Sequence, residues 1–337
     1  MKRFKIIFIS VLVISMSSCM SIEETAMKSA ANMLSSETGG ASVFTKDNDP
    51  ELIADALPLA LKLYEMVLAS NPEHAELHYS TGKNFVMYAN AFIQTPAGML
   101  PDEEYKKQEE MVIRAKKMYI RGRDYIIDGI ELNHPGFTEA VENGQLDEAL
   151  KMTNESKDAG MLYWAASGWI GAYSCDPFDF ELANTLYIPS AMLLRALELD
   201  ENFNKGAIHD IFIQIYSSLP YSHIIKAEEN APETVGLFSK TYYKNNVPSG
   251  TLGDKVNYHF KKALEIANGT NPGTYCSYAG SVCVKEQNYK EYKELLEKAL
   301  AINPEDDPAN ELVTTIFQDK ARWMLEHAED FFIVTEE

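Results

Sequence analysis

Cysteine and basic residues are both scarce in this chain. Only 4 of its 337 residues are Cys, which is too few for a disulfide-stabilised scaffold. Its 30 Lys and Arg stand against 50 Asp and Glu, so the formal net charge at pH 7 is -20. Nucleic-acid binding depends on basic side chains that displace counterions from phosphates. So acidic a chain is therefore not expected to bind nucleic acid.

A hydrophobic run long enough to cross a membrane is also missing at the N-terminus. The apolar run from Ile6 to Ile14 has nine residues, whereas a spanning helix needs about 20. The run follows the basic start Met1-Lys2-Arg3-Phe4-Lys5 and precedes small residues. This order is typical of a secretory signal peptide, which we assign to residues 1–18.

The residues at the expected cleavage point resemble a bacterial lipoprotein box. Met16-Ser17-Ser18-Cys19 places two small residues before a Cys. The resemblance implies a lipid on Cys19 that holds the mature chain to a bacterial membrane, facing the periplasm, with residues 19–48 as a tether. The alternative is an ordinary secreted protein in which residue 19 happens to be Cys. Loss of residues 1–18 removes only basic charge, so the mature chain would carry -23.

The rest of the chain is predicted to be all-α. No sustained alternation of apolar and polar residues predicts strands. Small and apolar residues recur at helical spacing from Arg114 to Leu132, and again from Phe317 to Phe332. Both segments are expected to be amphipathic helices that need a partner surface.

A short phrase recurs along the chain at multiples of a tetratricopeptide period of about 34 residues. Its copies begin at Val67, Ile130, Ala196, Ala263 and Ala299. We therefore expect residues 49–333 to form one α-α superhelix of tetratricopeptide-like helical hairpins. The alternative is an irregular all-α domain with chance similarities.

The spacing inside one repeat supports the superhelix. Ala60, Tyr64 and Val67 fit the pattern of a second helix, and Gly82 and Phe85 fit the first helix of the next hairpin. Small residues let paired helices approach closely, and aromatic residues fill the space between hairpins. Gly82 is therefore predicted to lie at a close helix contact.

Several phrases together resemble the TatT family, the tetratricopeptide lipoproteins associated with TRAP (tripartite ATP-independent periplasmic) transporters. They lie at residues 43–45, 47–58, 88–94, 121–125, 162–169, 206–210, 295–301 and 320–325. The resemblance implies an exported, lipid-anchored α-solenoid that docks the transporter's periplasmic substrate-binding subunit. It also implies an internal hydrophobic cavity through which a small hydrophobic or organic-acid ligand is held or passed.

The sequence is also compatible with a function other than transport. A generic envelope tetratricopeptide scaffold with no ligand is the alternative function. No phosphate-binding loop, nucleophile elbow or pair of catalytic carboxylates stands out, so we predict neither an enzyme nor a bound cofactor. A homo-oligomer is left open by the sequence.

The segment from Tyr163 to Tyr173 is the densest aromatic stretch of the chain. Its rings are expected either to pack between helices or to line a ligand cavity, because ligand sites are mostly apolar with few polar groups. A second group of residues is expected to supply polar contacts, with Arg195 able to meet a carboxylate. The candidate ligand-binding residues are Tyr163, Trp164, Trp169, Tyr173, Tyr187, Arg195 and His209.

Two histidines and three cysteines of the body could in principle bind zinc or form a disulfide. His74 and His78 lie four residues apart, as zinc ligands do, but the sequence offers no clear third ligand, so solvated side chains are expected. Cys276 and Cys283, if they share one helix, lie about 10 Å apart, too far for a disulfide. Buried thiols are predicted, with a bridge from Cys175 as the alternative.

Overall fold

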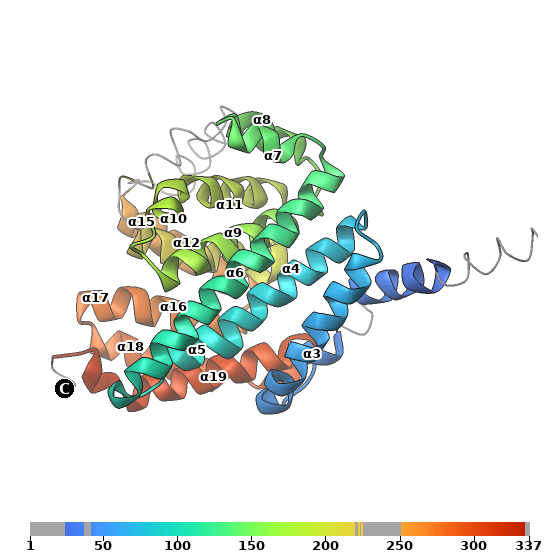
Figure 1. Ribbon diagram of the computed structural model, residues 1–337. Helices are drawn as coiled ribbons and strands as arrows, with labels where there is room; N and C mark the ends of the chain where they lie inside the picture. The colour runs from blue at the N-terminus through green and yellow to red at the C-terminus, as the bar shows by residue number, and fades with distance from the viewer. Residues whose placement is uncertain (1–23, 37–41, 220–221, 223, 225–250, 334–337) are drawn as a thin grey trace, which may run out of the picture.

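The computed structural model describes residues 24–36, 42–219, 222, 224 and 251–333, and the regular elements in these ranges are all helices (Figure 1). The predicted all-α class is thus confirmed for the described residues, and their arrangement is compatible with tetratricopeptide-like hairpins. The predicted signal peptide and the lipidation site Cys19 lie outside these residues, as do parts of the predicted tether.

The first half of the array runs from a helix at residues 24–35 to the helix that carries the aromatic segment. Its elements are α2 (Ser42–Thr45), α3 (Pro50–Ala69), α4 (Ala75–Ala89), the π-helix η1 (Asn90–Gln94), α5 (Thr95–Ala97), η2 (Asp102–Glu104), α6 (Tyr105–Asn133), α7 (Phe137–Glu142), α8 (Leu146–Met152) and α9 (Asp158–Cys175).

The second half continues the array to the C-terminal helix. Its elements are α10 (Phe180–Thr185), α11 (Tyr187–Leu199), α12 (Phe203–Ser218), α15 (Leu252–Ile266), α16 (Pro272–Tyr278), the π-helix η3 (Ala279–Cys283), α17 (Val284–Glu286), α18 (Tyr289–Leu300), η4 (Pro304–Asp306), η5 (Pro308–Asn310), α19 (Glu311–Glu326) and η6 (Ala328–Asp330).

The long helix α6 and the C-terminal helix α19 correspond to the two helices that residue spacing predicted. α6 covers the predicted segment and buries Gly122 and Ile126 on the expected face. The C-terminal prediction is wrong at its end, because α19 stops at Glu326 and Phe332 is buried outside a regular helix. At this end the His327 backbone N–H and Nδ1 of its ring lie 3.0 and 2.9 Å from the Trp323 carbonyl oxygen, so both contacts hold the last turn of α19.

Glycines set the closest helix contact, between α4 and α6. A Cβ on Gly82 would lie 2.4 Å from the Gly122 carbonyl oxygen, and a Cβ on Gly122 would lie 2.7 Å from the Gly82 carbonyl oxygen. No larger residue fits either position without moving the backbone. The close contact predicted at Gly82 is confirmed.

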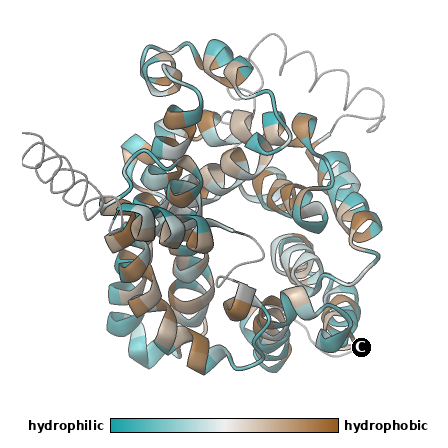
Figure 2. Cartoon of the chain, turned by 90° about the vertical axis from the view of Figure 1, so that its right-hand side faces the viewer, coloured by the Kyte–Doolittle hydropathy of each residue, from teal (hydrophilic) through white to brown (hydrophobic). Residues whose placement is uncertain are grey.

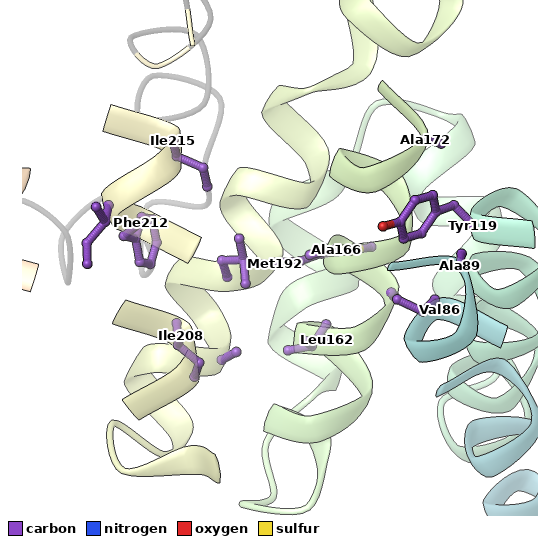
Figure 3. Close-up of a cluster of buried hydrophobic side chains, with 14 of the residues drawn as sticks. Val86, Ala89, Tyr119, Leu162, Ala166, Ala172, Met192, Ile208, Phe212 and Ile215 are labelled. Atoms are coloured by element: carbon purple, nitrogen blue, oxygen red, sulfur yellow. The ribbon is translucent and has the colours of Figure 1, made fainter. Parts of the chain in front are cut away.

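One continuous core joins α4, α6, α9, α11 and α12. Figure 3 shows these helices side by side, with Val86 of α4 and Tyr119 of α6 beside α9, and Met192 of α11 between α9 and α12. The predicted burial of Cys276 and Cys283 is confirmed. They and Cys175 are free thiols, so the alternative of a Cys175 bridge to either is wrong.

The two ends of the array meet. α19 contacts both α2 and α3, and Figure 1 shows α19 running beside α3. Figure 2 shows apolar and polar residues on different sides of most helices, as expected for amphipathic helices packed in layers. Among the helices of the described residues, none has the length and apolar character needed to cross a bilayer.

Candidate functional site

The aromatic segment lies on α9, which contacts α4, α6, α11 and α12. Nine of the 18 residues of α9 are buried, and most of these are small or aliphatic. The aromatic residues predicted to contact a ligand are half-buried instead: Tyr163, Trp164, Trp169 and Tyr173. These aromatic side chains, together with Ile170, therefore keep partial access to solvent.

Tyr163 is the centre of a small aromatic cluster. Its ring lies edge-on to Trp164, with centroids 5.1 Å apart, and its centroid is 5.2 Å from that of Phe203 at the start of α12. The Lys83 ammonium lies 5.8 Å from the centroid of the Trp164 ring. The cluster thus offers apolar faces together with one nearby cation.

Asp210 of α12 is a carboxyl group whose charge acts on Tyr163 of this cluster. Burial raises its pKa to about 7, although Thr274 and Asn271 act to lower it. The Asn271 amide donates to one carboxyl oxygen at 2.9 Å, and the other oxygen has no hydrogen-bond partner among the described residues. Burial, and secondarily the charge of Asp210, raise the pKa of Tyr163. Near neutral pH this carboxyl can therefore donate or accept a hydrogen bond.

Trp169 lies in a separate contact. Its indole N–H donates to the Thr185 hydroxyl oxygen at 3.1 Å, and the Arg123 guanidinium lies 4.7 Å from its ring centroid. Tyr173 and Tyr187 are both half-buried against the main core. Trp169 thus contacts α6 through Arg123 and α10 through Thr185.

A polar network beside Trp169 follows the π-helix η1. The Asn90 amide donates to the Tyr119 hydroxyl at 3.1 Å, and that hydroxyl donates to Gln94 Oε1 at 2.6 Å. Gln94 in turn donates to the Ser174 hydroxyl at 2.8 Å. π-helical turns are frequent at functional sites. Here the extra residue of the turn brings Asn90 and Gln94 to the same hydroxyl group.

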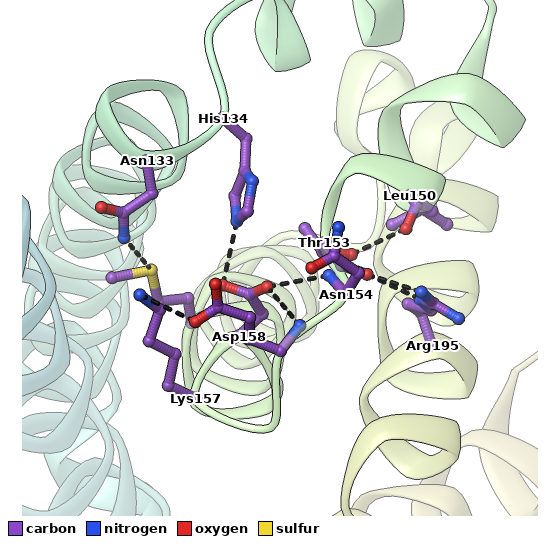
Figure 4. Close-up of polar contacts among 10 residues, drawn as sticks. Asn133, His134, Leu150, Thr153, Asn154, Lys157, Asp158 and Arg195 are labelled. Atoms are coloured by element: carbon purple, nitrogen blue, oxygen red, sulfur yellow. Dashed lines mark hydrogen bonds and ion pairs between the residues drawn. The ribbon is translucent and has the colours of Figure 1, made fainter.

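Arg195 of α11 is bonded within the chain. Its Nε and one terminal nitrogen donate to the Thr153 carbonyl oxygen at 3.0 and 2.6 Å, and another terminal nitrogen bonds Glu198 at 2.5 Å. Figure 4 shows this contact beside the His134–Asp158 pair, whose Nε2–Oδ1 distance is 2.9 Å. Arg195 thus satisfies a carbonyl at the C-terminal end of α8.

His209 is fully buried at the contact between α12 and α15. Its Nδ1 lies 2.7 Å from Nδ1 of His259, and its Nε2 lies 3.7 Å from a carboxylate oxygen of Glu201. Burial, with a smaller effect of Lys262, lowers the pKa of His209 to about 4. The pair is therefore neutral at pH 7, and His209 faces the interior of the protein.

The structure gathers only part of the predicted ligand site. Tyr163 and Trp164 touch each other, and the charge of Asp210 acts on Tyr163, while Trp169 makes a different contact and Arg195 caps another helix. The ligand roles of the seven residues stay predictions. Neither Asp210 nor His259 was predicted from the sequence, although His209-Asp210 stood inside a phrase of the family resemblance.

The histidines considered for zinc serve helix α4. His74 caps it by accepting from the Leu77 N–H at 3.1 Å. His78 is buried rather than solvated, which corrects the expectation, and its Nε2 lies 2.8 Å from the Pro72 carbonyl oxygen. Within the ranges that the structure describes, no three His, Cys, Asp or Glu residues are grouped to hold a metal.

Comparisons with known proteins place the chain in a family. Residues 46–223 and 235–332 match the TRAP transporter T-component family. An uncharacterized protein of Treponema pallidum (strain Nichols) is 33% identical over 293 residues, which cover 86% of this chain and 83% of the relative. The chain therefore belongs to the TRAP transporter T-component family.

Proposed function

We propose that this chain is a lipoprotein, anchored through Cys19, that binds the periplasmic substrate-binding subunit of a TRAP transporter and holds or passes a small ligand. Family membership, which associates the chain with a TRAP transporter, supports the choice of partner. The excess of acidic residues favours a partner with a basic rim, which would be steered to this surface most strongly at low salt.

The observation that carries the ligand part of the proposal is the half-buried cluster of Tyr163, Trp164 and Phe203, whose Tyr163 also feels the charge of Asp210. Ligand sites combine apolar walls with a few placed polar groups, and this cluster has that composition. A small hydrophobic or organic-acid molecule suits the rings. The Asp210 carboxyl, when protonated, can donate to an oxygen of an acid.

The test is a pull-down of the full chain from membranes after mild detergent extraction, followed by identification of the proteins and small molecules that co-purify. Trp164→Ala is expected to lose the small molecule and to keep the substrate-binding subunit. Trp323→Ala is the matched control, because Trp323 lies on α19, stacked on His327 with centroids 4.5 Å apart. Absence of the substrate-binding subunit from the wild-type pull-down would contradict the proposal.

A ligand-free envelope scaffold is the second candidate. The observation in its favour is that Arg195 and His209, two predicted polar contacts, are bonded to other parts of the chain. A wild-type pull-down that brings down protein partners and no small molecule would support the scaffold against the ligand carrier.

A further inference from the structure

The short loop between α9 and α10 exposes two phenylalanine rings. Phe178 is 87% exposed, and Phe180, the first residue of α10, is 80% exposed. They are the most exposed aromatic side chains among the described residues. An aromatic side chain buries about 150–250 Å² when it is covered, so the pair offers roughly 300 Å² of apolar surface, a size at which exposed patches are often functional.

The loop that carries the two rings is held in place by its acidic residues. Lys116 of α6 bonds Asp176 at 2.8 Å and Asp179 at 2.7 Å. The Asp179 carboxylate also accepts from the backbone N–H groups of Glu181 and Leu182, at 2.9 and 3.1 Å, which caps α10. Both Asp side chains thus turn back to the protein, while both Phe side chains stay outside it.

The loop has the features of an anchor for a protein partner. A ring that is already held in place loses little conformational freedom on binding, and aromatic anchors that fill a pocket dominate many protein–protein interfaces. Three acids, Asp176, Asp179 and Glu181, accompany the rings, with Lys116 as the base that lies against them. The excess of acid favours an apolar pocket that has a basic rim.

The loop lies on the side of the molecule away from the proposed lipid anchor. The helix at residues 24–35 is fixed to α3, where the Tyr64 hydroxyl donates to the Leu34 carbonyl oxygen at 3.0 Å. Cys19 precedes this helix by five residues, which span at most about 18 Å. Figure 1 shows the helix at residues 24–35 on the right and α10 on the left. The loop therefore faces soluble proteins rather than the membrane.

We propose that Phe178 and Phe180 are the contact through which this chain docks the soluble substrate-binding subunit, by filling an apolar pocket with a basic rim on that subunit. The inference rests on the proposed function and adds the surface that performs the docking. This surface is distinct from the aromatic cluster around Tyr163, because the twelve residues from Tyr163 to Cys175 extend about 18 Å along α9. Docking and ligand binding are therefore separable by mutation.

The test measures the affinity of the full chain, in mild detergent, for the substrate-binding subunit that co-purifies with the wild type. Phe178→Asp is expected to weaken binding at least about thirtyfold, as truncation of a central interface residue does. Met33→Asp is the matched control, because Met33 is 58% exposed on the helix at residues 24–35 and the substitution adds the same charge. Its affinity is expected to stay within about threefold of the wild type. Circular dichroism verifies that each variant is folded.

The outcomes separate this inference from the proposed function. A wild type that brings down no substrate-binding subunit overturns both. A wild type that binds the subunit, with Phe178→Asp binding it within about threefold as tightly, overturns the docking surface alone. An equal loss of affinity in Met33→Asp also overturns it, because the effect would then not belong to the loop.

A photo-crosslinker identifies what covers the loop in the membrane-anchored protein. With p-benzoylphenylalanine in place of Phe178, the full chain in its own membrane is expected to crosslink to the substrate-binding subunit. The same crosslinker in place of Met33 is expected to leave that subunit unlinked. Crosslinks from position 178 that reach only lipid, or only another copy of the chain, overturn the proposal.

Discussion

Nδ1 of His209 lies 2.7 Å from Nδ1 of His259 in the buried contact between α12 and α15. Two nitrogens at this distance can share only one hydrogen, so one ring donates and the other accepts. Phe212 stacks on the His259 ring with centroids 4.8 Å apart, which leaves an apolar surrounding on that side. The pair is thus built for two neutral rings.

The histidine pair should make the fold sensitive to acid. Burial lowers the pKa of His209 to about 4, and burial, His209 and Lys255 lower the pKa of His259 well below its ordinary value. Between about pH 6.5 and pH 4 the unfolded chain takes up protons that the folded chain does not, so stability falls as the pH falls. His209→Gln should reduce this loss by roughly 3 kcal/mol, since each pKa unit corresponds to about 1.4 kcal/mol.

Urea unfolding of the wild type and of His209→Gln at pH 7.5 and pH 4.5 measures this effect. His327→Gln is the control, because His327 lies in the turn after α19 and has no contact with the pair. An equal loss of stability in the wild type and in His209→Gln would contradict the explanation.

Asp210 should make the fold less stable as the pH rises, whereas the histidine pair makes it less stable as the pH falls. Its pKa is raised to about 7 by burial, from an ordinary value near 3.8. As the pH rises through this window the unfolded chain releases a proton that the folded chain keeps, so stability falls with rising pH. Asp210→Asn should therefore be more stable than the wild type at pH 8, by roughly 4 kcal/mol, with little gain at pH 4.

Thermal or urea unfolding of Asp210→Asn across this pH range measures the difference. Asp330→Asn, at an exposed position after α19, is the control for the loss of one acidic charge. A gain at pH 8 shared by both variants would show that net charge, rather than burial of Asp210, is responsible.

The packing of the helices could be predicted from the sequence where it depends on local patterns. The spacing around Gly122 predicted the buried side of α6, and the place of Gly82 in the repeat predicted the close contact with α4. Such features follow from helical periodicity and side-chain size, which a single segment already contains.

The polar contacts could not be predicted in the same way. His209 and His259 lie 50 residues apart in sequence, and Asp210 meets Asn271 across 61 residues. Their pairing depends on how α12, α15 and α16 stack, which periodicity does not determine. The π-helix η1 was missed for a related reason, because its extra residue is stabilised by Tyr119 from another helix.

Gly82→Ala should damage the contact between α4 and α6. Its Cβ would lie 2.4 Å from the Gly122 carbonyl oxygen, and a backbone atom cannot move away as a flexible side chain can. We expect a loss of roughly 3 kcal/mol or more in the free energy of unfolding.

Gly253→Ala is the matched control for Gly82→Ala. Gly253 lies in the first turn of α15, where an added Cβ meets no atom within 4 Å. Alanine favours the helix there, by about 0.5–1 kcal/mol relative to glycine. In urea unfolding, Gly82→Ala is expected to lower the free energy of unfolding and Gly253→Ala is expected to raise it. If Gly82→Ala leaves the free energy of unfolding unchanged, α4 and α6 are farther apart than these distances indicate.

Arg195→Lys separates the structural role of Arg195 from its predicted ligand role. A lysine ammonium cannot reproduce the two bonds to the Thr153 carbonyl oxygen and also reach Glu198. We expect a loss of about 1–2 kcal/mol in stability. Arg322→Lys, at an exposed ion pair with Asp319, is the control and should change stability by less than about 0.5 kcal/mol.

The small molecules that co-purify with Arg195→Lys decide between the two roles. If Arg195 serves only the end of α8, the variant is less stable in urea unfolding but retains the same molecules as the wild type under conditions where both are folded. If Arg195 binds a ligand carboxylate, those molecules are lost while the free energy of unfolding stays close to that of the wild type. Because the guanidinium already bonds the Thr153 carbonyl at 2.6 Å, we expect the first result.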